Sequence, residues 1–253
     1  MRVEDERLER ELLSAFERRK SAIAALSAEA RIENYGRRGV VKGRITLLVD
    51  RGGRLRIDGW SPTDDLVATL CATKGSFGYF ERGAGECLVG RPCPRNLRRF
   101  LPLGLTFEDV LLALLGVPPL RRPRGEWGLY YDDGLRSHVL SSVVTLPGGE
   151  TGFQHLWLLA DGTAIRYQLE DEKGVIYVME ASKLRGRKGE VRFPRRLRIR
   201  IERDGTEVVV KYRQVEIDPR LEGDSFSFEC PRGLVVRELD CEDDPSGGGP
   251  SGG

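Results

Sequence analysis

The chain has 253 residues, and its 41 Lys and Arg residues nearly balance 39 Asp and Glu residues, leaving a formal net charge of +2. This length suits one large β domain or two closely fused halves, and the balanced charge argues against a protein dedicated to nucleic acid. No run approaches the roughly 18 apolar residues of a membrane span. Residues 1–13 lack the apolar region of a signal peptide, so the chain is either cytosolic or has lost an export signal.

The first predicted element is a helix over residues 4–25. Apolar residues, Leu12 and Phe16 among them, recur at near-helical spacing, and the positions between them are mostly Glu and Arg. Such a helix has one apolar stripe and should pack on a flat apolar surface. The small side chains of Ala28 and Ala30, in the strand predicted next, would let a helix approach closely.

A meander of short strands is predicted to follow, up to residue 80. Apolar residues and one Gly occupy every second position of 41–49, with Lys42, Arg44 and Thr46 between them. This is the period of a strand with one buried face. A Gly pair at 52–53 indicates a hairpin turn before the alternation resumes.

A second helix is predicted at 106–116, after a short helical turn at 95–100. Thr106 is suited to cap its first turn, and Gly116 followed by Pro118 is a stop signal. The helix is apolar almost all round. It is therefore either an ordinary core helix or the cover of a cavity whose occupant is itself apolar.

The second half of the chain returns to strands, which are predicted at 127–131, 137–146, 152–160, 164–169, 175–181, 197–202, 208–217 and 233–239. About a dozen strands and two substantial helices without βα alternation indicate a mainly β protein with helices, of α+β class, and argue against a parallel sheet. We expect residues 1–241 to form a single domain and the Gly, Ser and Pro tail 242–253 to be disordered.

Five cysteines bear on the compartment. Cys87 and Cys93 enclose a loop, and Cys230 and Cys241 bracket a predicted final strand, so both spacings would allow a bridge. Cys71 lies in an apolar strand and is expected to be a buried free thiol. The alternative is five unrelated reduced cysteines. We predict no metal site, because the cysteines form no C-x-x-C pair and no histidine is near them.

Motifs of catalysis are absent from the sequence. It contains no phosphate-binding G-x-x-x-x-G-K, no H-E-x-x-H and no G-x-S-x-G. His138 and His155, the two histidines, fall in strand patterns, and the acid pairs at 64–65 and 132–133 fall in turns. We therefore predict a protein that is not an enzyme and uses no cofactor.

One charge feature stands out. Arg196, Arg198 and Arg200 share one face of a predicted strand. Such a row could bind the phosphates of nucleic acid or of lipid headgroups. The favoured interpretation is a solvated outer face that nearby acids such as Glu202 and Glu207 partly neutralise.

The opening meander carries an ordered set of short motifs: Arg54-Leu55-Arg56-Ile57, Ser61-Pro62, Leu70, Lys74-Gly75, Phe77 and Tyr79. This set resembles the early meander of the bacterial lipoprotein carrier and receptor proteins LolA and LolB. The order of elements agrees over most of the chain, since a helix and strands precede a helical insertion at 94–116 and more strands follow it.

The resemblance implies an incomplete antiparallel β-barrel of about eleven strands, covered by the N-terminal helix and a central helical lid. It implies that acyl chains of a lipoprotein or another lipid bind between sheet and lid. An acyl chain gains free energy from burial against apolar side chains and needs few specific polar contacts. The residues expected to contact lipid are Ile45, Leu47, Leu55, Ile57, Leu66, Leu70, Phe77 and Tyr79 on the concave face and Phe107, Leu111 and Leu114 on the lid. Which alternate face of strand 66–73 is concave stays open.

The resemblance also implies a place and partners. It points to the periplasm or the periplasmic face of the outer membrane, to a monomer and to contacts with other envelope proteins. The receptor type presents an exposed leucine near the corresponding proline, so Trp60 and Pro62 are candidates to face the membrane, although Asp64 and Asp65 oppose insertion into an anionic bilayer. The alternative is a structural or adaptor subunit whose barrel is filled by its own side chains.

Overall fold

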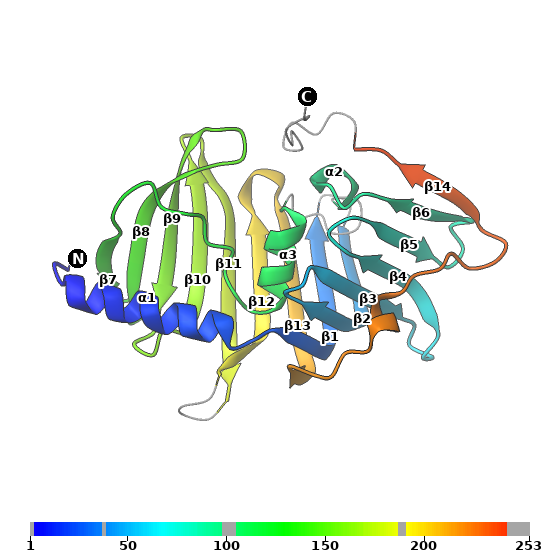
Figure 1. Cartoon of the computed structure of the whole chain (residues 1–253), viewed down its shortest axis with the longest axis horizontal. Helices are drawn as coiled ribbons and strands as arrows, with labels where there is room; N and C mark the ends of the chain where they lie inside the picture. Colours follow the sequence, from blue (N-terminus) through cyan, green and yellow to red (C-terminus); the bar gives the residue numbers. More distant parts are fainter. Residues whose placement is uncertain (1–2, 37–38, 98–104, 187–190, 242–253) are drawn as a thin grey trace.

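The computed structural model describes residues 3–36, 39–97, 105–186 and 191–241. Fourteen strands form a single curled sheet with helices across one side (Figure 1). Its edge strands each have one neighbour within the described residues, so the sheet stays open. The predicted mainly β fold, an incomplete barrel with helical cover, is confirmed, with more strands than the expected eleven. The tail 242–253 and residues 98–100 of the predicted helical turn lie outside the described residues.

The N-terminal half of the chain holds α1 (Glu6–Ser21), β1 (Ala25–Gly36), β2 (Gly39–Asp50), β3 (Arg54–Trp60), β4 (Leu66–Ala72), β5 (Phe77–Glu81), β6 (Glu86–Gly90), α2 (Pro94–Leu97) and α3 (Phe107–Leu114). The C-terminal half holds β7 (Gly128–Asp132), β8 (Ser137–Thr145), β9 (Thr151–Leu158), β10 (Ala164–Asp171), β11 (Gly174–Arg185), β12 (Phe193–Ile201), the 3₁₀ turn η1 (Glu202–Asp204), β13 (Thr206–Ile217), the 3₁₀ turn η2 (Gly223–Phe226) and β14 (Val235–Leu239). The short strand β6 and the two 3₁₀ turns are elements that the sequence pattern did not predict.

Neighbouring strands of the sheet are also consecutive in sequence, with two exceptions. β1 pairs with β13 as well as with β2, which joins the two halves of the chain into one surface. β14 pairs with β6 in parallel, whereas the other pairs are antiparallel. The last strand therefore lies beside β6, and the strand order runs β14-β6-β5-β4-β3-β2-β1-β13-β12-β11-β10-β9-β8-β7.

The two faces of the sheet differ in cover. We call the face under α1 and α3 the inner face and the opposite one the outer face. Ile45, Leu47 and Val49 of β2 point to the inner face and are at most 6% exposed. Cross-strand pairing continues this apolar face through both halves of the sheet, and the two helices contribute to the same core. One core therefore lies between the inner face and the helices.

α1 is fastened at both ends. The Asp5 side chain accepts from the backbone N–H of Leu8 at the start of the helix, and near its end Arg19 donates to the Asp161 carboxylate at 2.8 Å. The helix is shorter than predicted because the Asp218 carboxylate accepts from the N–H groups of residues 24 and 25, where β1 begins. None of the helices that the structure describes combines the length and apolar character needed to cross a bilayer.

The outer face of β3–β5 is covered by the segment between β13 and β14. We call residues 219–234 the strap. Arg54 stacks at 4.6 Å over the Phe226 ring of the strap, and a Cβ on Gly78 would overlap the Phe228 ring. Cys71 is buried beneath the strap as a free thiol, as predicted, and donates to the Phe226 carbonyl. This end of the sheet is thus packed on both faces.

The disulfides connect the strap and β14 to the region of β6. Cys87 is bonded to Cys230, with 5.9 Å between their Cα atoms, and Cys93 to Cys241, with 6.2 Å. The pairing of sequence neighbours, Cys87 with Cys93 and Cys230 with Cys241, is therefore wrong. The reason is the parallel return of β14, which brings residues almost 150 positions apart next to each other.

Candidate ligand-binding groove

α3 forms where the capping signals predicted it. The Thr106 hydroxyl accepts from the N–H of Asp109 at 3.2 Å, and Gly116 follows the helix at a φ of +73°. Leu111 and Leu114 are 4% and 8% exposed. Because so much of its surface is apolar, α3 contacts the core on one side and lines a groove on another.

The groove has a volume of about 820 Å³, within the usual range for small-molecule sites. Leu112 and Leu115 line it beside two of the predicted lid residues, Phe107 and Leu111. The charged side chains of Lys20, Arg51, Lys74, Glu108, Asp109 and Arg121 also line the groove. Its chemistry is therefore amphipathic, with an apolar helix side and several cations around it.

The C-terminal end of α3 is tied to the sheet. Tyr212 of β13 donates its buried hydroxyl to the Leu114 carbonyl at 2.9 Å. Its ring lies edge-on to Phe193 of β12, with 5.1 Å between ring centroids. Burial raises the pKa of Tyr212 well above its ordinary value, so the hydroxyl remains a donor. A carbonyl at the end of a helix lacks an intrahelical partner, and Tyr212 supplies one.

The first turn of α3 is tied to the loop that follows it. The Asp109 carboxylate, 5% exposed, forms an ion pair with Arg121. Burial raises the pKa of Asp109, while Arg121 and Thr106 favour its charged form. Gln154 of β9 then holds the Arg121 backbone, accepting from its N–H at 3.0 Å and donating to its carbonyl at 2.9 Å. The cover is thus connected to β9 through a buried polar chain.

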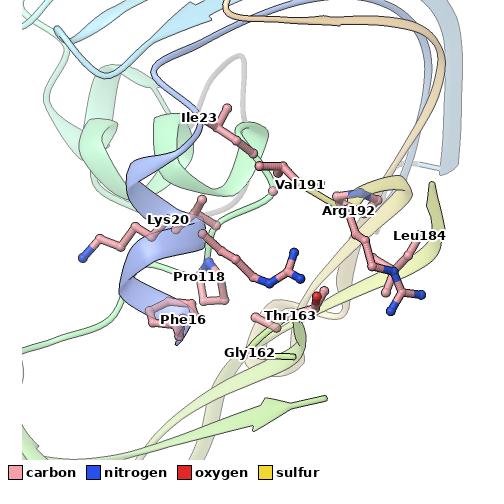
Figure 2. Close-up of a pocket in the computed structure, with 14 residues that line it drawn as sticks. Phe16, Lys20, Ile23, Pro118, Gly162, Thr163, Leu184, Val191 and Arg192 are labelled. Atoms are coloured by element: carbon pink, nitrogen blue, oxygen red, sulfur yellow. The ribbon is translucent and has the colours of Figure 1, made fainter. Parts of the chain in front are cut away.

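A separate cavity under α1 is far smaller, at about 40 Å³ (Figure 2). Phe16 and Pro118 face Gly162 and Thr163 of the β9–β10 turn across it. A Cβ on Gly162 would collide with Ala15 of the helix, so glycine there lets α1 sit directly on the turn. This space admits at most a few water molecules, which leaves the groove beside α3 as the larger space on the helical side.

The predicted concave residues, Leu66 excepted, lie in or against the core beneath the helices. Ile45, Leu47, Leu55, Leu70 and Phe77 are buried. Ile57 and Tyr79 are partly buried and pack against the core, and Leu66 is partly exposed at the start of β4. These eight residues do not line the groove, whereas the lid residues Phe107 and Leu111 do, and Leu114 lies on the core side of α3. Their contact with a ligand stays a prediction.

Sequence reasoning did not single out the residues that hold the cover. Arg121, Gln154 and Tyr212 have no motif. Gln154 nevertheless carried a usable signal, because it is a polar residue at an inward position of an alternating strand and is fully buried. Such a residue must find hydrogen-bond partners.

The Trp60–Pro62 loop projects from the β3–β4 end of the sheet. The Trp60 indole donates to Thr46 at 3.1 Å across the outer face. Asp64 forms an ion pair with Arg44, and Asp65 lies 3.9 Å from Arg82, so both opposing carboxylates are partly neutralised. Trp60 and Pro62 border a depression together with Arg31, Lys42, Arg44 and Arg213. Whether this loop faces a membrane stays a prediction.

The arginine row of β12 lies on the outer face among acids. Arg198 pairs with Glu207 at 2.9 Å and lies 3.6 Å from Glu180, and Arg200 lies 3.6 Å from Glu202. These ion pairs match the favoured interpretation of a solvated outer face and reduce the charge available for phosphates.

Neither a protein-family model nor a curated protein matches the chain by sequence. Solved structures do match its fold. A DUF1329 family protein from Desulfovibrio piger superposes with a TM-score of 0.60 at 13% identity, covering 87% of this chain and 97% of that one. A LolA superfamily protein from Nitrosomonas europaea has a TM-score of 0.52 at 10% identity, covering 86% and 97%. The fold is LolA-like.

A third match is an outer membrane lipoprotein-sorting protein domain from Vibrio parahaemolyticus, with a TM-score of 0.57 at 13% identity over 87% of this chain and 97% of that one. At such identities the likeness concerns the fold alone. The resemblance drawn from the motifs at 54–79 and from the order of elements is therefore confirmed at the level of the LolA-like fold.

Proposed function

We propose that this protein is a non-enzymatic lipid-binding protein that holds an acyl chain of a lipoprotein or another lipid beside α3. The observation that carries the proposal is the row of Phe107, Leu111, Leu112 and Leu115 along one groove of about 820 Å³. A lipid chain gains about 0.8 kcal/mol per buried methylene and needs few polar contacts. The LolA-like fold supports this function, since one match is a lipoprotein-sorting domain.

The predicted concave residues contact the lipid chain when α3, which covers them, moves away from the sheet. Ile45, Leu47 and Leu55 are already part of the core that α3 covers. A chain longer than the groove can reach them only if α3 lifts, which breaks the Tyr212 hydrogen bond and the Asp109–Arg121 pair. The proposal therefore includes a closed state, seen here, and a more open one that accepts the ligand.

The proposed place of action is the periplasm or the periplasmic face of the outer membrane. Two disulfides support an oxidising compartment. In this proposal residues 1–241 act as a single-domain monomer in lipoprotein or lipid transport. Trp60 and Pro62 face the membrane. Other envelope proteins deliver or receive the lipid.

The test is lipid binding by the purified protein. We expect acyl lipids to be extracted from it, and a fluorescent fatty acid to bind with saturation. Leu112 lines the groove and is only partly buried, so Leu112→Asp should abolish probe binding without unfolding the protein. Leu135→Asp is the matched control, because Leu135 is 44% exposed and is not among the residues that line the groove.

Two results would contradict the proposal. If the wild-type protein returns no lipid and binds no probe, the core is filled by its own side chains and the protein is a structural or adaptor subunit. If Leu112→Asp binds the probe as well as Leu135→Asp does, the ligand lies elsewhere.

A further inference from the structure

The outer face of β7–β9, on the side away from α1 (Figure 1), contains a second hollow of about 620 Å³. Its shape follows from strand register. Gly128, Ser141 and His155 are aligned across the three strands and form a floor of small or partly buried side chains. Because Gly128 has no side chain, the Tyr130 ring leans over it, and a Cβ there would come within 3.0 Å of a ring carbon.

Larger side chains stand on either side of this floor. The neighbouring row holds Tyr130, Val139 and Trp157, and the row on the other side holds Val143 and Phe153. Tyr130 is 38% exposed and Phe153 is 41% exposed. Large aromatic surfaces on the solvent side of a sheet are unusual for residues that serve only the core, and here they surround a common depression. We call these residues and the floor the aromatic hollow.

Carboxylates give the aromatic hollow an acidic lining. Glu126 and Asp132 line it, and no Lys or Arg is among the described residues that do. Hydrogen bonds from the backbone N–H of Leu135 and from the Trp157 indole lower the pKa of Asp132, so its carboxylate is charged. The Ser141 hydroxyl lies 2.8 Å from Nδ1 of His155, and burial lowers the pKa of that imidazole. The floor is therefore polar but uncharged near neutral pH.

The same surface already holds one cation of the protein itself. The Arg166 guanidinium lies 4.8 Å from the centroid of the Trp157 ring. Its charge is partly balanced by Glu180 at 3.9 Å. The π face of an aromatic ring carries partial negative charge and attracts cations. Arg166 and Trp157 form such a cation–π pair at the border of the hollow.

We propose that the aromatic hollow binds a quaternary ammonium group. Aromatic side chains stand on two sides, Glu126 and Asp132 add negative charge, and methyl groups around a nitrogen fit the apolar walls. A primary ammonium would have to replace its water by three hydrogen-bond acceptors, and the Gly128, Val139 and Val143 surfaces provide none, so only the acids and the polar floor could supply them. The group can belong to a free compound such as choline or to a choline headgroup of a lipid.

Calorimetric titration with tetramethylammonium and choline tests the proposal, with 3,3-dimethylbutanol as the uncharged analogue of choline. We expect both cations to bind and the alcohol to bind at least several-fold more weakly. Phe153→Ala and Tyr130→Ala should each weaken choline binding about two- to fivefold, the range for cation–π contacts at exposed sites. Val41→Ala, at a position of β2 that is 67% exposed and outside the lining, should leave it unchanged.

The outcomes separate cleanly. Absence of binding by both cations, or equal binding of the alcohol, would overturn the proposal, provided that circular dichroism shows each variant folded. Flotation with vesicles of phosphatidylcholine and of phosphatidylglycerol then identifies the source. Binding to the former alone assigns the cation to a lipid headgroup, and free choline binding without vesicle binding assigns it to a solute. The groove beside α3 is on the other face, so failure here leaves the fatty-acid test unaffected.

Discussion

The outer face of the sheet is covered at one end and exposed at the other. At β3–β6 the strap and two disulfides cover the outer face, so both faces are packed. At β7–β9 the outer face carries exposed Tyr130 and Phe153, and the strap, which covers β3–β5, does not extend to it within the described part of the chain. Both ends share the same inner core under the helices. The difference suggests that the first end is built for stability, whereas the second leaves apolar surface available for contact.

The largest effect should come from releasing the strap. The Cys87–Cys230 bond links residues separated by 143 positions, and a long closed loop restricts the unfolded chain strongly. The double variant Cys87→Ser, Cys230→Ser should therefore lose about 2–5 kcal/mol of unfolding free energy, measured by urea denaturation. Hydrogen exchange should rise at β4–β6 and β14 and remain low at β7–β9.

The control is Cys71→Ser, which removes a thiol and leaves both bridges and a donor to the Phe226 carbonyl in place. Equal denaturation midpoints for this control and the double variant would mean that the strap contributes little. Exchange that rises equally at β7–β9 would mean that the two ends unfold as one unit.

A matched pair of phenylalanines compares the two outer faces directly. Phe226 on the strap is 6% exposed, whereas Phe153 of β9 is 41% exposed. Phe226→Ala should cost about 3 kcal/mol because it leaves a cavity over β3–β4. Phe153→Ala should change stability by less than about 0.5 kcal/mol. Thermal or urea unfolding measures both, and similar losses would remove the distinction between a covered and an open face.

The same contrast explains what sequence patterns could predict. Along β2 one face meets the core and the other is largely solvated, so alternation placed Ile45 and Leu47 correctly. In β4 both Leu70 on the inner face and Cys71 on the outer face are buried. Its two faces look alike in sequence because the strap, about 150 residues later, covers one of them. Local periodicity carries no information about so distant a partner.

The candidate groove was predictable in part for similar reasons. An apolar helix with clear capping signals pointed to Phe107 and Leu111, and both line the groove. Tyr212 lies about 100 residues beyond that helix, and it contacts the Leu114 carbonyl only because β13 pairs with β1 at the centre of the sheet. The disulfide partners depend in the same way on the parallel β14–β6 pairing.

A third prediction concerns the two covers of the inner face. Tyr212→Phe removes the donor to the Leu114 carbonyl and leaves that acceptor buried, at a cost of about 1–2 kcal/mol. Amide exchange should accelerate in α3 while α1, held by Arg19 and Asp161, is unchanged. Fatty-acid probes should enter faster in this variant if α3 is the lid. Unchanged exchange in α3 would show that the hydrogen bond does not hold the cover.

The smallest expected effect is a pH dependence at the open end. Burial lowers the pKa of His155 below its ordinary value of about 6.5, more than the neighbouring Glu170 raises it. The unfolded chain therefore binds a proton more readily than the native one. Neutral His155 contributes its full share of the free energy of unfolding above about pH 6.5, and this share is lost as the pH falls through the lower pKa that His155 has in the native protein. Between pH 7.5 and 5.5 the melting temperature of the wild type should fall slightly more than that of His155→Gln.

His138→Gln is the matched control, because His138 lies on the neighbouring strand β8 and its loss removes one histidine without touching the Ser141 contact. The control should keep the wild-type decline. If His155→Gln and the wild type decline in parallel, His155 is solvated in the native protein. The floor of the aromatic hollow would then gain positive charge at mildly acidic pH as readily as a free histidine, and choline binding should weaken below about pH 6.5.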